Sequence, residues 1–341
     1  MHLAAALGLL ATVLPTSLMA DIGGRVLPCD QVTAAPACQR AAELWGFVPS
    51  GGIAVLADRL RLAGVESLPG DDRAVILDLA LPGGEVLAVV PLPPSVPLTA
   101  VTELSPDGAV LLVVDPVAEP ELDAIAPQTL LVFDATGQQI GAAEGLAVSA
   151  MADAFGENRL GFAPGRVTLD LAPLGVAGAV SVRYDSGKVE GGALIPDGMW
   201  LYDALFDRDR SWQHDDATVV ATYARDGSPS TVILQGAEAD RTLIASGSPG
   251  SASAYGVEFF GPVLSPDAAR LAVLQLGEAA PGPILVALDM ASGGEIWRGS
   301  VAWHKARWPV YRWTPDGALV ILQPHPVLPD LSVLTLFSPA P

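Results

Sequence analysis

A tight turn of the form Ser/Thr-Pro-Asp-Gly, set between short apolar runs, recurs along the chain and constrains its fold more than any other feature. The clearest copies begin at Ser105, Ser265 and Thr314, and an apolar run follows each of them. Proline suits the second position of a type I turn, and glycine at the fourth position takes the left-handed conformation that closes a hairpin. In the copy at Ser265, Ala268 takes the place of this glycine and fits less well. Each copy predicts a β-hairpin.

Two further copies extend the pattern, one at Val48-Pro49-Ser50-Gly51-Gly52 and one at Ile195-Pro196-Asp197-Gly198. The turn prolines 49, 106, 196, 266 and 315 are therefore 57, 90, 70 and 49 residues apart. We expect the longest step to contain a degenerate turn within residues 155–162, and the step of 70 residues leaves room for one more unit. Units of about fifty residues with short strands and Gly/Pro turns are typical of β-propellers.

The predicted fold is thus all-β, a single β-propeller of six or seven four-stranded blades over residues 46–341. The strand expected at 331–337 should close the ring beside N-terminal strands. Composition agrees, because 35 glycines and 30 prolines among 341 residues disfavour a mainly helical fold. With half of its residues hydrophobic, the chain is long enough to bury a sizeable core.

The chain is strongly acidic, and this limits its partners. It has 38 acidic and 18 basic residues and a formal net charge of −20, which repels nucleic acid and anionic lipid surfaces. Residues 74–158 contain twelve acidic residues and neither lysine nor arginine, so one sector should carry a negative field. We expect no nucleic-acid partner.

The first twenty residues have the layout of a secretory signal peptide. An apolar run over residues 3–14 is followed by Pro15 and then by Leu18-Met19-Ala20, before Asp21. We expect cleavage after residue 20, a periplasmic or secreted protein, and no membrane insertion after cleavage. An uncleaved anchor is the alternative, since twenty residues just suffice to span a bilayer.

The chain has two cysteines, Cys29 and Cys38. An exported protein meets an oxidising compartment, where such a pair is expected to form a disulfide. Residues 21–45 then make an N-terminal segment held by this disulfide, between the signal peptide and the propeller. Redox catalysis would need a Cys-x-x-Cys motif, and a metal site would need nearby histidines; this segment has neither.

The Ser-Pro-Asp-Gly hairpins resemble the WD-like repeats of TolB-type propellers, which occur in bacterial exported proteins. The resemblance covers most of the mature chain. It implies a propeller that serves as a protein-docking platform, and it carries over no catalytic residue.

A second resemblance concerns Ala287-Leu288-Asp289-Met290-Ala291-Ser292-Gly293-Gly294-Glu295-Ile296-Trp297. This segment is similar to the docking repeat Ala-x-Asp-x-x-Thr-Gly-x-x-x-Trp of pyrroloquinoline-quinone propellers, and residues 134–137 are a partial echo of it. The resemblance implies a glycine turn between the third and fourth strands of a blade, and a Trp297 that packs on the next blade. It does not imply the quinone cofactor, because the vicinal cysteine pair of several such dehydrogenases is missing.

Four of the seven tryptophans lie within residues 297–313, a stretch that contains no acidic residue. If 310–313 is an innermost strand, the loop before it lies at the mouth of the propeller. Tryptophan and arginine frequently anchor interfaces. The candidate partner-binding residues are Trp303, His304, Lys305, Arg307 and Trp308. Packing between blades, with the arginines reaching solvent, is the alternative reading.

Acidic loops are expected on the same face, at 115–124 and 203–216. Calcium prefers clustered oxygen ligands, and its weak candidate ligands here are Asp203, Asp207, Asp209, Asp215 and Asp216. Their spacing matches no known calcium loop, and Arg208 and Arg210 lie among them. The alternatives for these acids are a solvated loop and a surface for a basic partner.

No residue pattern typical of catalysis is present. The mature chain has three histidines, His214, His304 and His325, without metal-ligand spacing, and it lacks Gly-x-Ser-x-Gly. We therefore predict no catalytic residue and no cofactor, and a non-catalytic periplasmic module that binds a protein partner. The alternative function is a propeller hydrolase or lactonase that uses a carboxylate-bound divalent metal, with Asp203 and Asp207 as leading ligands.

Overall fold

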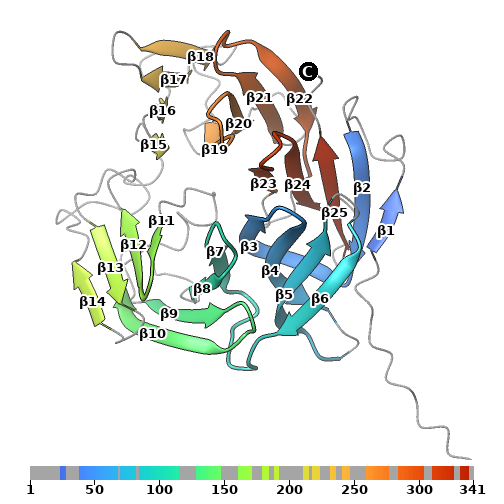
Figure 1. Cartoon of the computed structure of the whole chain (residues 1–341), viewed down its shortest axis with the longest axis vertical. Helices are drawn as coiled ribbons and strands as arrows, with labels where there is room; N and C mark the ends of the chain where they lie inside the picture. Colours follow the sequence, from blue (N-terminus) through green and yellow to red (C-terminus); the bar gives the residue numbers. More distant parts are fainter. Residues whose placement is uncertain are drawn as a thin grey trace, which may run out of the picture.

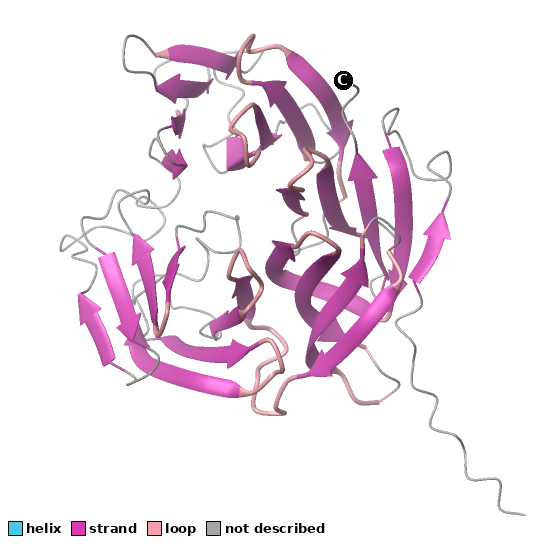
Figure 2. Ribbon diagram, viewed as in Figure 1, coloured by secondary structure: helices cyan, strands magenta, loops and turns pink. Residues whose placement is uncertain are grey.

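The computed structural model describes the residues 24–27, 38–67, 70–81, 84–114, 128–146, 160–170, 179–183, 188–191, 210–214, 217–222, 231–235, 240–245, 259–275, 283–302, 309–325 and 331–337. Every regular element in these ranges is a β-strand (Figure 2). The all-β prediction is confirmed for this part of the chain. The predicted signal peptide lies outside it. In the described residues no helix is long and apolar enough to cross a membrane.

The strands form six antiparallel sheets, which we number from 1 to 6. Sheet 1 contains β3 (Phe47–Val55), β4 (Arg59–Glu66), β5 (Arg73–Ala80) and β6 (Val86–Pro91). Sheet 2 contains β7 (Val101–Leu104), β8 (Val110–Val114), β9 (Gln128–Asp134) and β10 (Gln139–Leu146). Sheet 3 contains β11 (Leu160–Ala163), β12 (Arg166–Asp170), β13 (Ala179–Arg183) and β14 (Lys188–Gly191).

Sheet 4 contains β15 (Arg210–His214), β16 (Ala217–Ala221), β17 (Thr231–Gln235) and β18 (Arg241–Ala245). Sheet 5 contains β19 (Phe259–Leu264), β20 (Arg270–Gln275), β21 (Ile284–Asp289) and β22 (Glu295–Ser300). Sheets 1 to 5 each pair their four strands in chain order. Figure 1 shows the sheets following one another around a common centre, with the first strands of sheets 1, 2, 5 and 6 on the inside.

Sheet 6 joins the two ends of the chain. Its order is β23 (Val310–Trp313), β24 (Leu319–Pro324), β25 (Leu331–Phe337), β2 (Cys38–Trp45) and β1 (Gly24–Leu27). The C-terminal strand β25 pairs with β24 on one side and with the N-terminal β2 on the other, with Trp45 opposite Leu331. The predicted position of the C-terminal strand beside N-terminal strands is confirmed.

Three predicted Ser/Thr-Pro-Asp turns join the first strand of a sheet to the second, in sheets 2, 5 and 6. In sheet 2 the Ser105 hydroxyl donates to Asp107 Oδ1 at 2.6 Å, and the same carboxylate oxygen accepts the Ala109 N–H at 3.0 Å. The turns at Ser265 and Thr314 repeat the hydroxyl–carboxylate bond. Ala268 is held at a φ of 54°, a left-handed conformation that is unfavourable for alanine.

Two other predicted turns are wrong. Pro49 lies inside β3, where residues 50–52 bulge out of register opposite Ala63, because Gly51-Gly52 permits a bulge without reversing the chain. The hairpin turn of sheet 3 lies at Pro164-Gly165, beyond the predicted stretch 155–162, and Leu160 already begins β11. The copy at Pro196 lies outside the described residues, in the connection between β14 and β15.

The docking-repeat resemblance is confirmed in its structural part. Residues 290–294 connect β21 to β22, and Asp289 Oδ1 accepts hydrogen bonds from the backbone and hydroxyl of Ser292, both at 2.6 Å. Trp297 packs on Phe337 of the next sheet, with ring centroids 4.6 Å apart. The partial echo at Asp134 also forms a turn, between β9 and β10.

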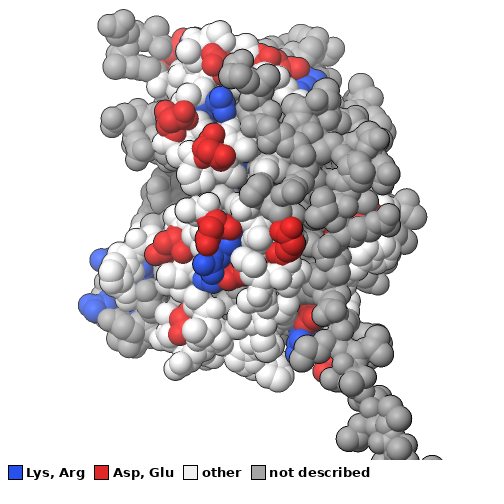
Figure 3. Space-filling view, turned by 45° about the vertical axis from the view of Figure 1, so that its right-hand side comes forward, with Lys and Arg blue, Asp and Glu red and all other residues white. Residues whose placement is uncertain are grey.

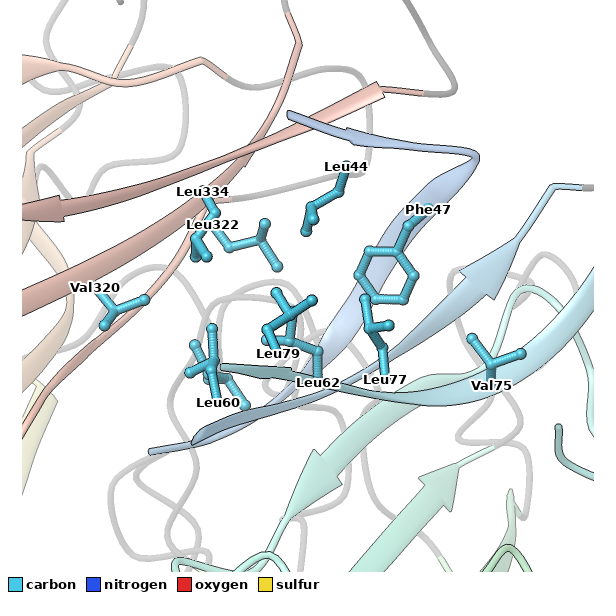
Figure 4. Close-up of a cluster of buried hydrophobic side chains, with 11 residues drawn as sticks. Leu44, Phe47, Leu60, Leu62, Val75, Leu77, Leu79, Val320, Leu322 and Leu334 are labelled. Atoms are coloured by element: carbon cyan, nitrogen blue, oxygen red, sulfur yellow. The ribbon is translucent and has the colours of Figure 1, made fainter. Parts of the chain in front are cut away.

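Hydrophobic clusters fill the described junctions between neighbouring sheets. Figure 4 shows the junction of sheets 1 and 6, where Phe47, Leu62 and Leu77 meet Leu322 and Leu334. Similar clusters lie between sheets 1 and 2, between sheets 4 and 5, and between sheets 5 and 6. At these four junctions neighbouring sheets bury their faces against each other.

The two edges of the sheets differ in the length of their connections. The connections from first to second strand and from third to fourth strand contain two to five residues; we call their side the turn edge. The ten-residue connection between β1 and β2 also leaves from this edge, because β2 begins at Cys38, opposite Phe337. The connections that leave from the opposite side, the loop edge, contain six to eighteen residues, apart from the single Gly46 between β2 and β3. Loops of this length, held by a rigid scaffold, are where binding residues concentrate.

Candidate functional site

The first strands of sheets 1, 2 and 6 lie together at the inner side of the molecule. β3 contacts both β7 and β23 (Figure 1). Glu103 in β7 and Arg312 in β23 occupy the same repeat position, two residues before the Ser or Thr of the turn, and Val263 occupies it in sheet 5. The repeat therefore brings one variable residue per unit to corresponding places on these strands.

The side-chain direction of Arg312 follows from its neighbours. The Tyr311 hydroxyl donates to Gly261 O at 2.6 Å, and Trp313 Nε1 donates to Val263 O at 2.9 Å, so both side chains face sheet 5. Because side chains alternate along a strand, Arg312 points to the other side. Burial raises the pKa of Tyr311, which keeps its hydroxyl protonated as a donor.

Glu103 is positioned by the packing of β7 on the bulge of β3. Ser50 Oγ and Thr102 Oγ1 share a hydrogen bond of 2.7 Å, and the Gly52 N–H donates to Thr102 Oγ1 at 3.0 Å. A Cβ at Gly51, whose φ is +121°, would lie 2.8 Å from Thr102 O. This close approach fixes Thr102 towards β3 and leaves Glu103 on the opposite side of β7.

Arg312 and Glu103 meet across β3, and we call them the inner pair. Arg312 Nη2 lies 3.5 Å from Glu103 Oε1, and the two side chains are 23% and 13% exposed. Arg312 Nη1 donates to Tyr311 O at 2.9 Å. Two opposite charges, mostly buried but within reach of solvent, thus link sheets 2 and 6. Sequence reasoning missed this pair; aligning the turn copies shows that both residues share a repeat position, but not that they meet.

A second, more buried ion pair supports the scaffold. Arg61 binds Asp78 through Nε and Nη2, both at 2.7 Å, and its Nη1 donates to Gly108 O at 2.7 Å. The hydrogen bond to Asp78 raises the pKa of Arg61. Glu66, also buried, accepts from Arg73 at 2.6 Å. Figure 3 shows basic groups lying directly beside acidic ones near the middle of one face. In the described ranges no group of three or more His, Cys, Asp or Glu residues has a metal-binding arrangement.

The predicted partner-binding residues, Trp303, His304, Lys305, Arg307 and Trp308, lie outside the described residues. They belong to the connection between β22, which ends at Ser300, and β23, which starts at Val310. This connection leaves from the loop edge. The predicted strand 310–313 is confirmed as β23, the first strand of its sheet.

The acids predicted as calcium ligands also lie outside the described residues, but a described strand divides them. Asp203, Asp207 and Asp209 precede β15, whereas Asp215 and Asp216 follow it, between β15 and β16. The ends of a five-residue strand are about 13 Å apart. The expected single loop 203–216 is therefore wrong, because one group of acids belongs to the loop edge and the other to the turn edge.

The other predicted sites fall largely outside the described ranges. The acidic stretch 115–124 belongs to the connection between β8 and β9, at the loop edge. Cys38 begins β2, and Cys29 is not described, so the disulfide stays a prediction.

Comparison with known proteins shows the fold alone. No family model and no curated protein sequence matches the chain. A member of the DUF4221 family from Bacteroides vulgatus has a similar structure, with a TM-score of 0.52 and 10% identity over 93% of this chain and 99% of that one.

Two further solved structures are more distant. A protein described as TolB from Agrobacterium tumefaciens has 13% identity and a TM-score of 0.42, over 84% of this chain and 90% of that one. An oligogalacturonate lyase in complex with manganese has 15% identity and a TM-score of 0.42, over 86% and 78%. Similarity at this level supports no conclusion about activity.

Proposed function

We propose that the chain is a single six-bladed β-propeller that acts as an exported, non-catalytic interaction module for a protein partner. The observation that carries this proposal is the difference between the two edges. Apart from the connection between β1 and β2, one edge consists of turns of two to five residues, several of them closed by their own Ser/Thr and Asp side chains. Connections of up to eighteen residues gather at the other edge.

The composition of these long connections indicates the kind of partner. Trp303, Arg307 and Trp308 supply the large apolar and cationic groups that anchor protein interfaces. The acidic stretches 115–124 and 203–209 leave from the same edge and would steer a partner with basic groups around its contact surface.

The test is cross-linked affinity capture of the tagged mature protein from its native periplasm. One variant carries Trp303→Ala, Arg307→Ala and Trp308→Ala. The matched control carries Asp58→Ala, Gln138→Ala and Ile140→Ala, three exposed residues at or beside the turn edge. All three proteins must show the same circular dichroism spectrum. We expect one partner to be captured by the parent and the control and lost by the loop-edge variant. Equal capture by all three proteins, or capture by none, contradicts the proposal.

A further inference from the structure

We propose that β6, the outer strand of sheet 1, pairs edge to edge with β6 of a second copy of the chain and forms a twofold-symmetric dimer. β6 is the strand of sheet 1 farthest from the inner strand β3 (Figure 1). The contact is therefore separate from the loop-edge contact proposed above.

β6 has an open outer edge among the described strands. It pairs with β5 on one side, and no described strand lies on its other side. The Leu92 N–H donates to Ala74 O at 2.8 Å, and residues along an antiparallel pair alternate between bonded and unbonded positions. Val89 therefore turns its backbone N–H and C=O away from β5. Groups of this kind are a template for a strand of another chain.

β6 differs from the outer strands of the other sheets in its charge. Proteins commonly protect an open edge with charged side chains. Each of the other described outer strands contains at least one, namely Arg25 in β1, Glu144 in β10, Lys188 and Glu190 in β14, Arg241 in β18, and Glu295 and Arg298 in β22. β6 reads Val-Leu-Ala-Val-Val-Pro and contains none. This edge lacks the usual protection against pairing.

β6 is exposed and yet fixed in position. Leu87 is 53% exposed, more than any other large hydrophobic side chain in the described ranges. Val86 and Val89 pack against the core between sheets 1 and 6, and Val90 packs against the core between sheets 1 and 2. Because the strand is already ordered, pairing with a second copy costs little conformational entropy.

The composition of β6 suits pairing with itself. In an antiparallel pair centred on Ala88, Leu87 of each copy lies opposite Val89 of the other copy. Apolar pairs across strands stabilise a sheet, whereas like charges opposite each other destabilise it. Each copy has a net charge of −20, which opposes most contacts between copies, but the two β6 strands bring no charges together. A second copy is therefore a partner that this edge accepts.

The size of the contact sets its strength. A Cβ at Gly137 would lie 3.0 Å from Pro91 O, so the turn between β9 and β10 covers that end of the strand. Residues 86–90 remain for pairing, a small contact beside the roughly 1,200–2,000 Å² that stable interfaces bury. A twofold pair occupies both edges, so association stops at two copies. We expect a weak dimer whose population rises with concentration.

The test is sedimentation velocity of the full mature chain over a wide range of concentrations. Leu87→Lys should weaken the dimer by at least about tenfold, because each copy then brings a charge into the short pair. The matched control is Ile140→Lys, the same change at an exposed apolar residue of the outer strand β10, and it should dimerise like the parent. Val89→Pro removes an N–H that faces away from β5, so it should fold and stay monomeric.

Salt and the loop edge provide two further readouts. Salt screens the repulsion between two acidic copies and should therefore strengthen the dimer. The variant with Trp303→Ala, Arg307→Ala and Trp308→Ala should dimerise like the parent, which separates this contact from the loop-edge contact. Circular dichroism confirms that each variant is folded. A parent that stays monomeric at every concentration, equal dimerisation of Leu87→Lys and the parent, or an equal loss in Ile140→Lys overturns the proposal.

Discussion

Arg61 in sheet 1 donates to the carbonyl oxygen of Gly108, 2.7 Å away in the first turn of sheet 2. Arg270 in sheet 5 makes the same bond to Gly317 in the first turn of sheet 6, at 2.6 Å. Both pairs are 47 residues apart in the chain. An arginine of the second strand therefore binds the Ser/Thr-Pro-Asp turn of the following sheet. The spacing of 47 residues is close to the length of one repeat, so the same contact joins successive sheets.

The two arginines should differ in their effect on stability. Arg61→Gln leaves Asp78, whose side chain is 7% exposed, without its bidentate partner, so we expect a loss of about 3–5 kcal/mol in the free energy of unfolding. Arg270→Gln removes one hydrogen bond to a carbonyl oxygen and should cost about 1–2 kcal/mol. Urea unfolding curves measure both. The double variant Arg61→Gln with Asp78→Asn should be more stable than Arg61→Gln alone. If Arg61→Gln and Arg270→Gln lower the free energy of unfolding equally, the ion pair with Asp78 does not contribute to stability.

Ala268→Gly should stabilise the protein. Alanine at a φ of 54° is strained, whereas glycine adopts this conformation without a steric penalty. The more flexible unfolded chain offsets part of the gain, which leaves about 0.5–1 kcal/mol. Thermal unfolding followed by circular dichroism measures the change. The reverse substitution in the equivalent turn, Gly317→Ala at a φ of 81°, should destabilise; a rise in both melting temperatures would contradict the argument.

The turn aspartates should give a pH dependence to stability. The Ser105 hydroxyl and the Ala109 N–H lower the pKa of Asp107, and the Ser265 hydroxyl and the Ala269 N–H do the same for Asp267. Because the folded state holds these pKa values below the unfolded value of about 4, their contribution is present above that pH. It is lost as the pH falls through the lowered pKa.

NMR titration of the carboxyl carbons tests this pH dependence directly. Ser105→Ala should raise the pKa of Asp107 towards its ordinary value and leave that of Asp267 unchanged, and Ser265→Ala should do the opposite. If neither substitution moves its own aspartate, the hydroxyl bonds are not the cause.

The contribution of Trp297 to stability should come from the packing of its ring and not from its N–H group. The indole packs on Phe337, and within the described residues its buried Nε1 has no hydrogen-bond partner. Trp297→Phe keeps ring packing and removes an unsatisfied donor, so its stability should stay within about 1 kcal/mol of the parent. Trp297→Ala should cost about 3–5 kcal/mol because it opens a cavity between sheets 5 and 6. Guanidinium unfolding of the two variants separates ring packing from hydrogen bonding.

The turns could be predicted where the local sequence alone decides the geometry. Ser105, Ser265 and Thr314 each form their own hydrogen bonds to the aspartate two residues later, so four adjacent residues suffice. Pro49 was misread because Gly51-Gly52 is as suitable for a bulge as for a turn. The contact with Thr102, which selects the bulge, comes from another sheet and is invisible in the local pattern.

The inner pair could not be predicted for a similar reason. Glu103 and Arg312 are 209 positions apart in the sequence, and each alone looks like an ordinary charged residue on a strand. Their meeting depends on β3 lying between β7 and β23, which only the order of sheets around the centre decides. The acids on either side of β15 are the opposite case. They are close in the sequence, but the strand between them places them at different edges of the sheet.

Sheet 6 makes the N-terminal strands depend on a strand near the other end of the sequence. β25 lies between β24 and β2, so until Leu331–Phe337 leaves the ribosome the N-terminal strand β2 has no neighbour except β1. A chain that stops before this strand leaves Leu44 and Leu322, which share a core cluster with Leu334, without that contact. Such a chain cannot complete sheet 6, although sheets 1 to 5 contain none of its missing residues. A single strand inserted between the two ends of the chain thus decides whether sheets 1 and 6 share a complete core.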